Sequence, residues 1–196
     1  MYKRQLRGLA WERREVLQGL PSVLWSVYWN ENPWSQPPSY RFNWARGLDL
    51  EEYDAAEHEV LLFVGCTGSY DRRAQKVARA LVHLLQAAGV RFGVLREEPC
   101  CGEAVLSLGH RPYFEEIAQH TAEVLAERGV RHLVTLSPHA YDTFRNRYPA
   151  LDGEVRVEHY TQVLARLVRG GRLRFEGEVA WRVAFHDPCY LSLIHI

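Results

Sequence analysis

The stretch EVLLFVGCTGSYDRRAQKVARALVHLLQAAG, residues 59–89, decides the fold class of the chain. It begins with a short apolar run that suits a buried β-strand. From Asp71 onward the apolar residues recur with helical period, and the pattern ends on a glycine, as helices commonly do. This stretch therefore predicts one strand followed by one helix.

The same order returns along the rest of the chain. Further strands are predicted in VRFGVLR, RHLVTL, EVRVEHY and EVAWRVAFHDPCY, which are residues 90–96, 131–136, 154–160 and 178–190. Helical patterns follow the first three of them. Alternating strands and helices of these lengths predict an α/β fold, in which helices flank a parallel sheet.

The region before the first strand has a different character. Residues 6–20 carry leucine and valine at roughly helical spacing and predict a short amphipathic helix. Residues 21–49 are rich in proline and tryptophan and have no period, which indicates an ordered linker. We expect its four tryptophans to pack against the neighbouring domain rather than form a protein-binding or membrane surface; they are Trp25, Trp29, Trp34 and Trp44.

Length and charge restrict the function classes. The 196 residues are 47% hydrophobic, enough for one good core, and the 24 basic and 24 acidic residues balance. Such a balance does not favour nucleic acid as a partner. The early apolar run is about half the length of a membrane-spanning helix. Four cysteines without a signal-peptide pattern indicate a reducing, cytoplasmic compartment.

Both ends of the chain look foreign to the rest. The head MYKRQ and the tail LSLIHI can be encoded by strings that resemble a sequencing adapter read in both directions. The tail also holds two of the three isoleucines, Ile194 and Ile196, in an arginine-rich chain. We therefore expect residues 1–5 and 192–196 to be an adapter artefact, and the natural protein to continue past both ends.

The chemistry centres on the cysteines. In EEPCCGEAVLSLG, residues 97–109, Cys100 and Cys101 are adjacent. Consecutive Cα atoms lie about 3.8 Å apart, whereas a relaxed disulfide needs roughly 4.4 to 6.8 Å. Two readings remain, which are a pair of buried core thiols and a pair of thiolates that converge on a metal or cluster.

The positions of the cysteines favour the second reading. Cys66 follows the first predicted strand, the cysteine pair follows the second, and Cys189 follows the last. The ends of parallel strands share one edge of a sheet, where ligands normally bind. We expect the thiols to gather at this edge, with helix N-termini stabilising their thiolate forms.

The spacing resembles a known family. Cys66 is followed after 33 residues by Cys100, Cys101 and Gly102, and after 34 more by SPHA, residues 137–140. This is similar to the CCG or cysteine-rich domain of heterodisulfide reductase B and D subunits. The same domain occurs in the iron–sulfur subunits of glycolate oxidase, lactate-utilisation and anaerobic glycerol-3-phosphate dehydrogenase systems.

The resemblance also divides the chain into segments. AFHDPCYL, residues 184–191, looks like the opening of the second repeat of such proteins. The resemblance thus implies a helix and linker over residues 6–57, a first CCG repeat over 58–178, and the start of a truncated second repeat over 179–191.

The resemblance further implies a function. The chain would be part of an iron–sulfur electron-transfer subunit in a heterodisulfide reductase-like or dehydrogenase-associated oxidoreductase. The cofactor would be a cluster of 4Fe-4S type, with Cys66, Cys100, Cys101 and Cys189 among the ligands. The implied partner is a flavoprotein or ferredoxin-type redox subunit, and the full-length complex would associate peripherally with the inner face of the membrane.

One departure from the family pattern matters. Where the family has a closing CxxC, this chain has Ser137 and Ala140. A cubane cluster takes four cysteine ligands, so the set here is incomplete, with Ser137 and His139 as non-thiolate substitutes. Two alternatives therefore stand beside the electron-transfer hypothesis: a degenerate, cluster-free repeat that acts as a docking scaffold, and a zinc or thiol-redox domain.

Overall fold

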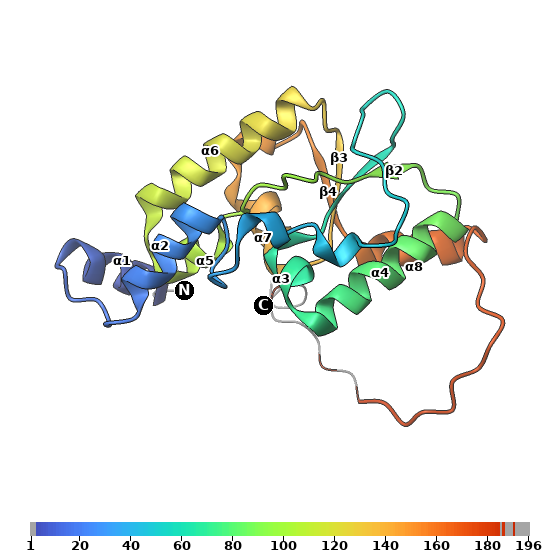
Figure 1. The fold of residues 1–196 in the computed structure, drawn as a ribbon, viewed down its shortest axis with the longest axis horizontal. Coiled ribbons are helices and arrows are strands. Elements are labelled where there is room, and N and C mark those ends of the chain that lie inside the picture. Colours follow the sequence, from blue (N-terminus) through green and yellow to red (C-terminus); the bar gives the residue numbers. More distant parts are fainter. Residues whose placement is uncertain (1–2, 185, 187–189, 191–196) are drawn as a thin grey trace.

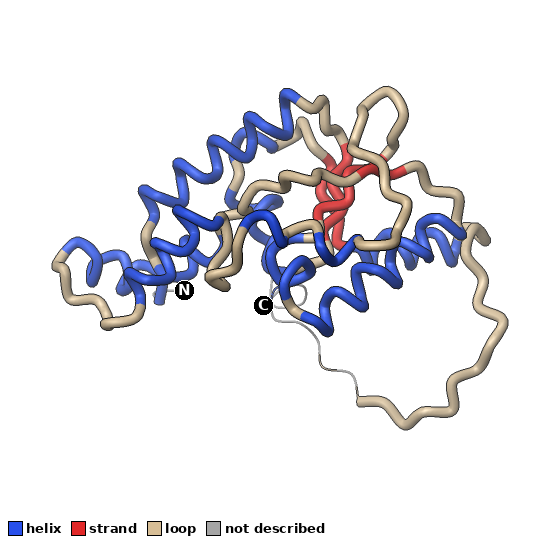
Figure 2. The backbone as a smooth tube through the Cα atoms, in the orientation of Figure 1, coloured by secondary structure: helices blue, strands red, loops and turns tan. Residues whose placement is uncertain are grey.

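A parallel sheet forms the centre of the protein. The computed structural model describes residues 3–184, His186 and Tyr190. Within these residues the sheet has four strands in the order β2-β1-β3-β4, all parallel (Figure 2). The strands are β1 Val60–Phe63, β2 Phe92–Gly93, β3 His132–Thr135 and β4 Arg156–His159. The predicted α/β fold with a parallel sheet is confirmed.

Helices cover both faces of this sheet (Figure 1). Alternate residues of β1 point to opposite faces, so that Leu62 joins the core beneath α4 and α8 while Leu61 joins the core beneath α6 and α7. The covering helices are α4 Arg72–Ala87, α8 Tyr160–Arg169, α6 Arg111–Glu127 and α7 Pro138–Arg147. A strand buried on both faces is typical of parallel sheets, and it explains the uninterrupted apolar run at residues 60–64.

Short elements occupy the ends of the strands. The six-residue helices α3 Gly65–Tyr70 and α5 Glu103–Leu108 follow β1 and the loop after β2. Three 3₁₀ turns complete the described elements, namely η1 Pro38–Tyr40, η2 Asn43–Ala45 and η3 Pro149–Leu151. The carboxyl edge of the sheet is therefore built from tight turns rather than long loops.

The N-terminal region differs from the prediction. The first helix, α1, spans Lys3–Glu12, and a second helix, α2, spans Leu20–Asn30. The predicted helix over residues 6–20 and the predicted linker from residue 21 are therefore wrong in their bounds. The reason is Pro21, which lies in the first turn of α2, where a missing backbone N–H breaks no helical hydrogen bond.

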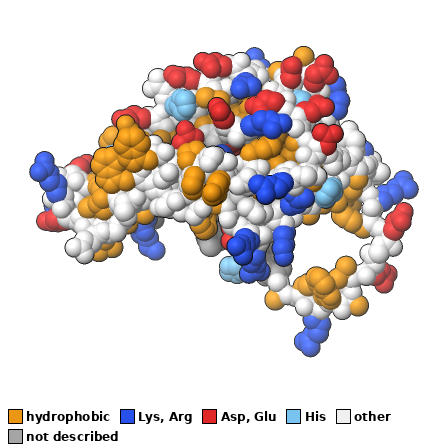
Figure 3. Space-filling view, in the orientation of Figure 1, with side chains coloured by type: hydrophobic (Ala, Val, Ile, Leu, Met, Phe, Trp, Pro, Cys, Tyr) orange, Lys and Arg blue, Asp and Glu red, His pale blue; other side chains and the backbone are white. Residues whose placement is uncertain are grey.

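The tryptophans of this region divide into two groups. Trp44 is buried in the core against α4, as expected. The expectation of packing is wrong for the others, because Trp25 and Trp29 are 61% and 70% exposed and Trp34 is also exposed. Trp25 and Trp29 lie four residues apart on α2, so both project from one side of that helix. Apolar side chains gather near this end of the molecule in Figure 3.

The last predicted strand is not formed in its described part. Residues 178–184 contain no strand and run outside the sheet (Figure 1). Their apolar side chains Val179, Trp181 and Val183 are largely exposed, since no neighbouring strand offers backbone hydrogen bonds. Cys189 lies outside the described residues. In the described part of the chain, no helix is long and apolar enough to cross a membrane.

Candidate cysteine site at the carboxyl edge of the sheet

Three cysteines follow two hydrogen-bonded strands. Cys66 lies in α3, directly after β1, and Cys100 and Cys101 end the loop that follows β2. All three are free and partly buried. Their charges interact, because the pKa of Cys101 is raised first by burial and then by Cys100 and Cys66. The structure therefore brings the three thiols into one neighbourhood at the carboxyl edge of the sheet.

Two glycines shape the turns that present these thiols. Gly65 and Gly102 both have positive φ, at +74° and +73°, a conformation that favours glycine. A Cβ atom on Gly102 would lie 2.9 Å from a ring carbon of Phe114, closer than ordinary contact. The Gly102 N–H also donates a hydrogen bond to the Cys100 sulfur at 3.3 Å. The glycine of the CCG sequence is thus required by both backbone geometry and space.

A buried ion pair lies beside the thiols. Glu98 accepts hydrogen bonds from the backbone N–H groups of Val64 and Gly65, at 2.7 and 2.8 Å. Its carboxylate also lies 3.5 Å from the guanidinium of Arg41, and both side chains are only 5% exposed. The sequence analysis missed this pair, because Glu98 stands beside the exposed Glu97 and Arg41 lies in a segment without a period.

Burial keeps the three groups in the thiol form. It raises the pKa of Cys66, with Arg41 opposing the shift, and it raises the pKa of Cys100 to about 12, with the Gly102 N–H opposing. The pKa of Cys101 is raised still further by burial. The expected stabilisation of thiolates by helix N-termini is therefore wrong, because desolvation outweighs the dipoles of two six-residue helices. Bound metal would have to displace the protons.

The segment SPHA lies beside the cysteine pair. The Ser137 hydroxyl accepts a hydrogen bond from the Ala140 N–H at 3.4 Å and caps α7, while the Ala140 side chain is buried. His139 Nδ1 lies 3.3 Å from the carboxylate of Glu103, the residue after the CCG sequence, and this bond raises the pKa of His139. The two proposed substitute ligands thus already have partners within the protein.

The donor chemistry of the site fits an iron–sulfur group only in part. Three thiols are the soft ligands such clusters prefer, and Cys66, Cys100 and Cys101 would supply them. Within residues 3–184, His186 and Tyr190, however, no three His, Cys, Asp or Glu side chains are arranged to hold a metal ion. The neighbourhood is correct, but the described side chains do not form a closed coordination shell.

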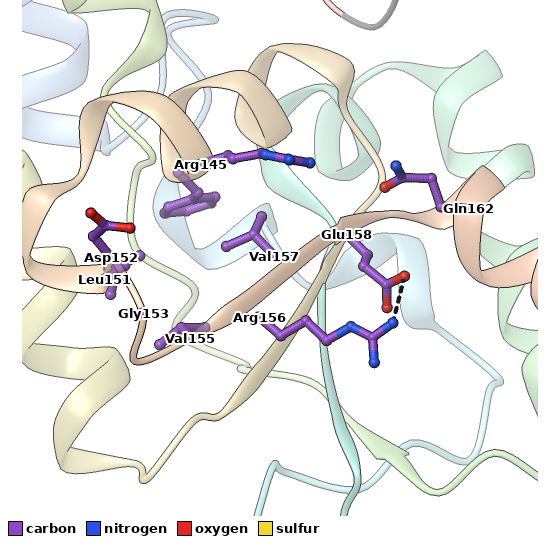
Figure 4. A pocket seen from close by; sticks show the side chains of 10 residues that line it. Arg145, Leu151, Asp152, Gly153, Val155, Arg156, Val157, Glu158 and Gln162 are labelled. Carbon is purple, nitrogen blue, oxygen red and sulfur yellow. Dashed lines mark ion pairs between the residues drawn. The ribbon is translucent and has the colours of Figure 1, made fainter.

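A separate hollow of about 360 Å³ lies along β4 (Figure 4). Its lining includes Arg156 and Glu158, which form an ion pair at 3.1 Å, together with Phe144, Asp152 and Gln162. Glu158 is also bound to Arg166 and His132. None of the three described cysteines lines this hollow, so it is not part of the thiol site.

Comparison with known proteins identifies the domain. Residues 60–145 match the family model described as the cysteine-rich domain, CCG. The chain contains a CCG cysteine-rich domain. The matched residues include all three thiols of the site and end within α7. The resemblance inferred from the cysteine spacing is confirmed.

Several relatives of this CCG chain are oxidoreductases by name. It is 37% identical over 170 residues to the EtfAB:quinone oxidoreductase of Syntrophomonas wolfei, covering 83% of this chain and 24% of that protein. It is 38% identical to the probable iron-sulfur-binding oxidoreductase FadF of Bacillus subtilis, with 82% and 24% coverage. The D-type component of the dihydromethanophenazine:CoB–CoM heterodisulfide reductase of Methanosarcina mazei is 30% identical, with 82% and 40% coverage.

The CCG chain therefore belongs with the CCG-domain iron–sulfur oxidoreductases, and it spans about a quarter of the length of the first two relatives. No solved structure matches the chain. The ligand roles of Cys66, Cys100, Cys101 and Cys189 stay predictions.

Proposed function

We propose that the chain is the part of an iron–sulfur oxidoreductase subunit in which Cys66, Cys100 and Cys101 bind a 4Fe-4S cluster that transfers electrons. The observation that carries this proposal is the placement of three thiols from adjacent strand ends in one partly buried neighbourhood. Cys189 would serve a second centre in the following repeat.

The residues around the thiols suit such a role. A bound cluster would supply one-electron chemistry, at a potential set by net charge, solvent exposure and hydrogen bonds to sulfur. Here the Gly102 N–H donates to the Cys100 sulfur, and Arg41 contributes a buried positive charge near Cys66 and Cys100. Both features favour the thiolate forms and the retention of electrons.

The relatives suggest the partners. The names of two of them refer to an electron-transferring flavoprotein and quinone, and to the disulfide of coenzymes B and M. We propose a flavoprotein or ferredoxin-type subunit as redox partner of this chain. We also propose a cytoplasmic location, with peripheral association at the inner face of the membrane through the full-length complex.

A docking scaffold without a cluster is the second candidate. Ser137 and Ala140 replace the closing cysteines, and Ser137 is engaged in capping α7. The lack of a metal-holding group among the described side chains points in the same direction. In this alternative the CCG fold serves only to bind a neighbouring subunit.

Anaerobic reconstitution of the chain with iron and sulfide tests the proposal. The measurements are iron and sulfide per chain and the EPR spectrum after reduction with dithionite. We expect bound iron, lost in Cys66→Ser, Cys100→Ser and Cys101→Ser. Cys189→Ser is the matched control, which should retain iron at the first site. Protein that folds but binds no iron would support the scaffold, and zinc bound in its place would support a zinc or thiol-redox domain.

A further inference from the structure

The two cysteine loops are joined by one side chain. The Glu98 carboxylate accepts from Val64 and Gly65, the two residues that immediately precede Cys66. Glu98 itself precedes Cys100 by two residues. Each carboxylate oxygen bonds one N–H, Oε2 to Val64 and Oε1 to Gly65, so the side chain bridges the turn after β1 and the loop after β2.

Arg41 adds a third segment to this connection. Its Nη1 lies 3.5 Å from Glu98 Oε1, and its Nη2 donates to the Glu31 carbonyl at 2.6 Å. The guanidinium carbon lies 5.8 Å from the centre of the Tyr70 ring in the last turn of α3. The region before the sheet is thereby attached to the helix that carries Cys66.

The pair is costly as a device for stability alone. Desolvating two charges offsets much of their attraction, and replacing a buried ion pair by apolar residues is often neutral or stabilising. This pair is fully satisfied, since no buried side-chain nitrogen or oxygen lacks a partner in the part of the chain that the structure describes. Fully satisfied polar networks fix one arrangement of the groups they join.

We propose that Glu98 and Arg41 form a positioning unit that fixes the Cys66 turn and the Cys100–Cys101 loop relative to each other. The importance of this unit for binding iron rests on the proposed function. The coupling of the two loops does not depend on it, and it is a property of the chain without metal.

Hydrogen exchange of the metal-free chain, followed by NMR, tests the coupling. The variants are Glu98→Gln and Arg41→Met, with matched controls at the exposed neighbours Glu97→Gln and Arg46→Met. Loss of Glu98 should speed exchange of the Gly65 amide, and also of the Gly102 amide in the other loop, by about tenfold or more. Arg41→Met should speed exchange at both amides as well, while Leu62 in β1 stays protected.

Two further variants separate positioning from general stability. Leu167→Ala removes a buried side chain on the opposite face of the sheet, so it should lower global stability without a selective effect on Gly65 and Gly102. The double variant Arg41→Met with Glu98→Leu leaves no lone buried charge. It should therefore fold even if the single variants do not, and it should still show loosened cysteine loops.

Iron counting completes the test. If the parent chain binds iron, Glu98→Gln and Arg41→Met should bind less of it than their controls do. Unchanged Gly102 exchange in Glu98→Gln, or unchanged Gly65 exchange in Arg41→Met, would overturn the inference, as would an unaffected double variant. A parent chain that binds no iron but shows the predicted exchange pattern would defeat the proposed function alone.

Discussion

The phenol of Tyr148 donates a hydrogen bond to the backbone carbonyl of Cys101, with the two oxygen atoms 3.0 Å apart. A second side chain, Thr121 of α6, donates to the carbonyl of Cys100 at 2.9 Å. Both carbonyls of the cysteine pair are therefore satisfied from the helical layer that covers this face of the sheet. The pair is held through its backbone, which leaves the sulfur atoms available for other partners.

Replacement of Tyr148 by phenylalanine tests this support. The change leaves the buried Cys101 carbonyl without its partner, which costs about 1–3 kcal/mol of unfolding free energy. Urea denaturation should show this loss. The same change at the exposed Tyr40 should leave the midpoint nearly unchanged, and equal effects at the two sites would contradict the assigned role of Tyr148.

Gly102→Ala should be more damaging. An alanine at positive φ costs about 1–2 kcal/mol, and its Cβ would meet the Phe114 ring, adding a cost of similar size. We expect both lower stability and a displaced cysteine pair, measurable by urea denaturation and by the reactivity of the thiols. Gly177→Ala is the control, because nothing lies within 4 Å of its Cβ position. A stable Gly102→Ala protein would show that the turn can relax.

His159 makes stability depend on pH. Burial lowers its pKa to about 4, with the Leu136 carbonyl opposing the shift, whereas an unfolded histidine titrates near 6.5. The unfolded chain therefore binds this proton first, so the stabilisation is complete above pH 6.5 and is lost as pH falls toward 4. The loss attributable to His159 is on the order of 2–3 kcal/mol.

His159→Asn removes this titration and keeps a side-chain acceptor at the start of α8. The difference in unfolding free energy between parent and variant should shrink as pH falls from 7 to 4, measured in urea at each pH. His120→Asn, at an exposed helix position, should give a difference that does not change with pH. A constant difference at His159 as well would rule out the proposed linkage.

Ser137→Cys should raise the iron content of the reconstituted chain. It adds a thiol at the start of α7, the helix whose His139 contacts Glu103 beside the cysteine pair. Iron per chain and the reduced EPR signal are the measurements. Ser22→Cys on α2 adds an equally exposed thiol away from the site, so iron gained equally by both variants would indicate nonspecific binding.

The sheet was predictable because its signal is local. An apolar run such as residues 60–64 and the helical period of residues 72–87 follow directly from what each face must bury. The helix α2 was missed because Pro21 reads as a break, although it lies where a helix tolerates it. The strand over residues 178–184 was predicted from composition, but pairing with a neighbouring strand is a tertiary property.

The site was predictable only in its cysteines. Spacing identified Cys66, Cys100 and Cys101, since residues that follow parallel strands meet at one edge. Glu97 and Glu98 look identical in sequence, and only the packed structure exposes one and buries the other beside Arg41. Thiol ionisation was also misjudged, because the extent of burial is set by residues far away in the chain.

The position of Arg41 bears on how the domain can be isolated. The family match begins at residue 60, yet the guanidinium that faces Glu98 comes from nearly twenty residues earlier. A shortened protein cut to the matched boundary would keep the carboxylate and lose its counter-charge, and truncations at this point should be judged defective for that reason before any weakness is blamed on the cysteines themselves.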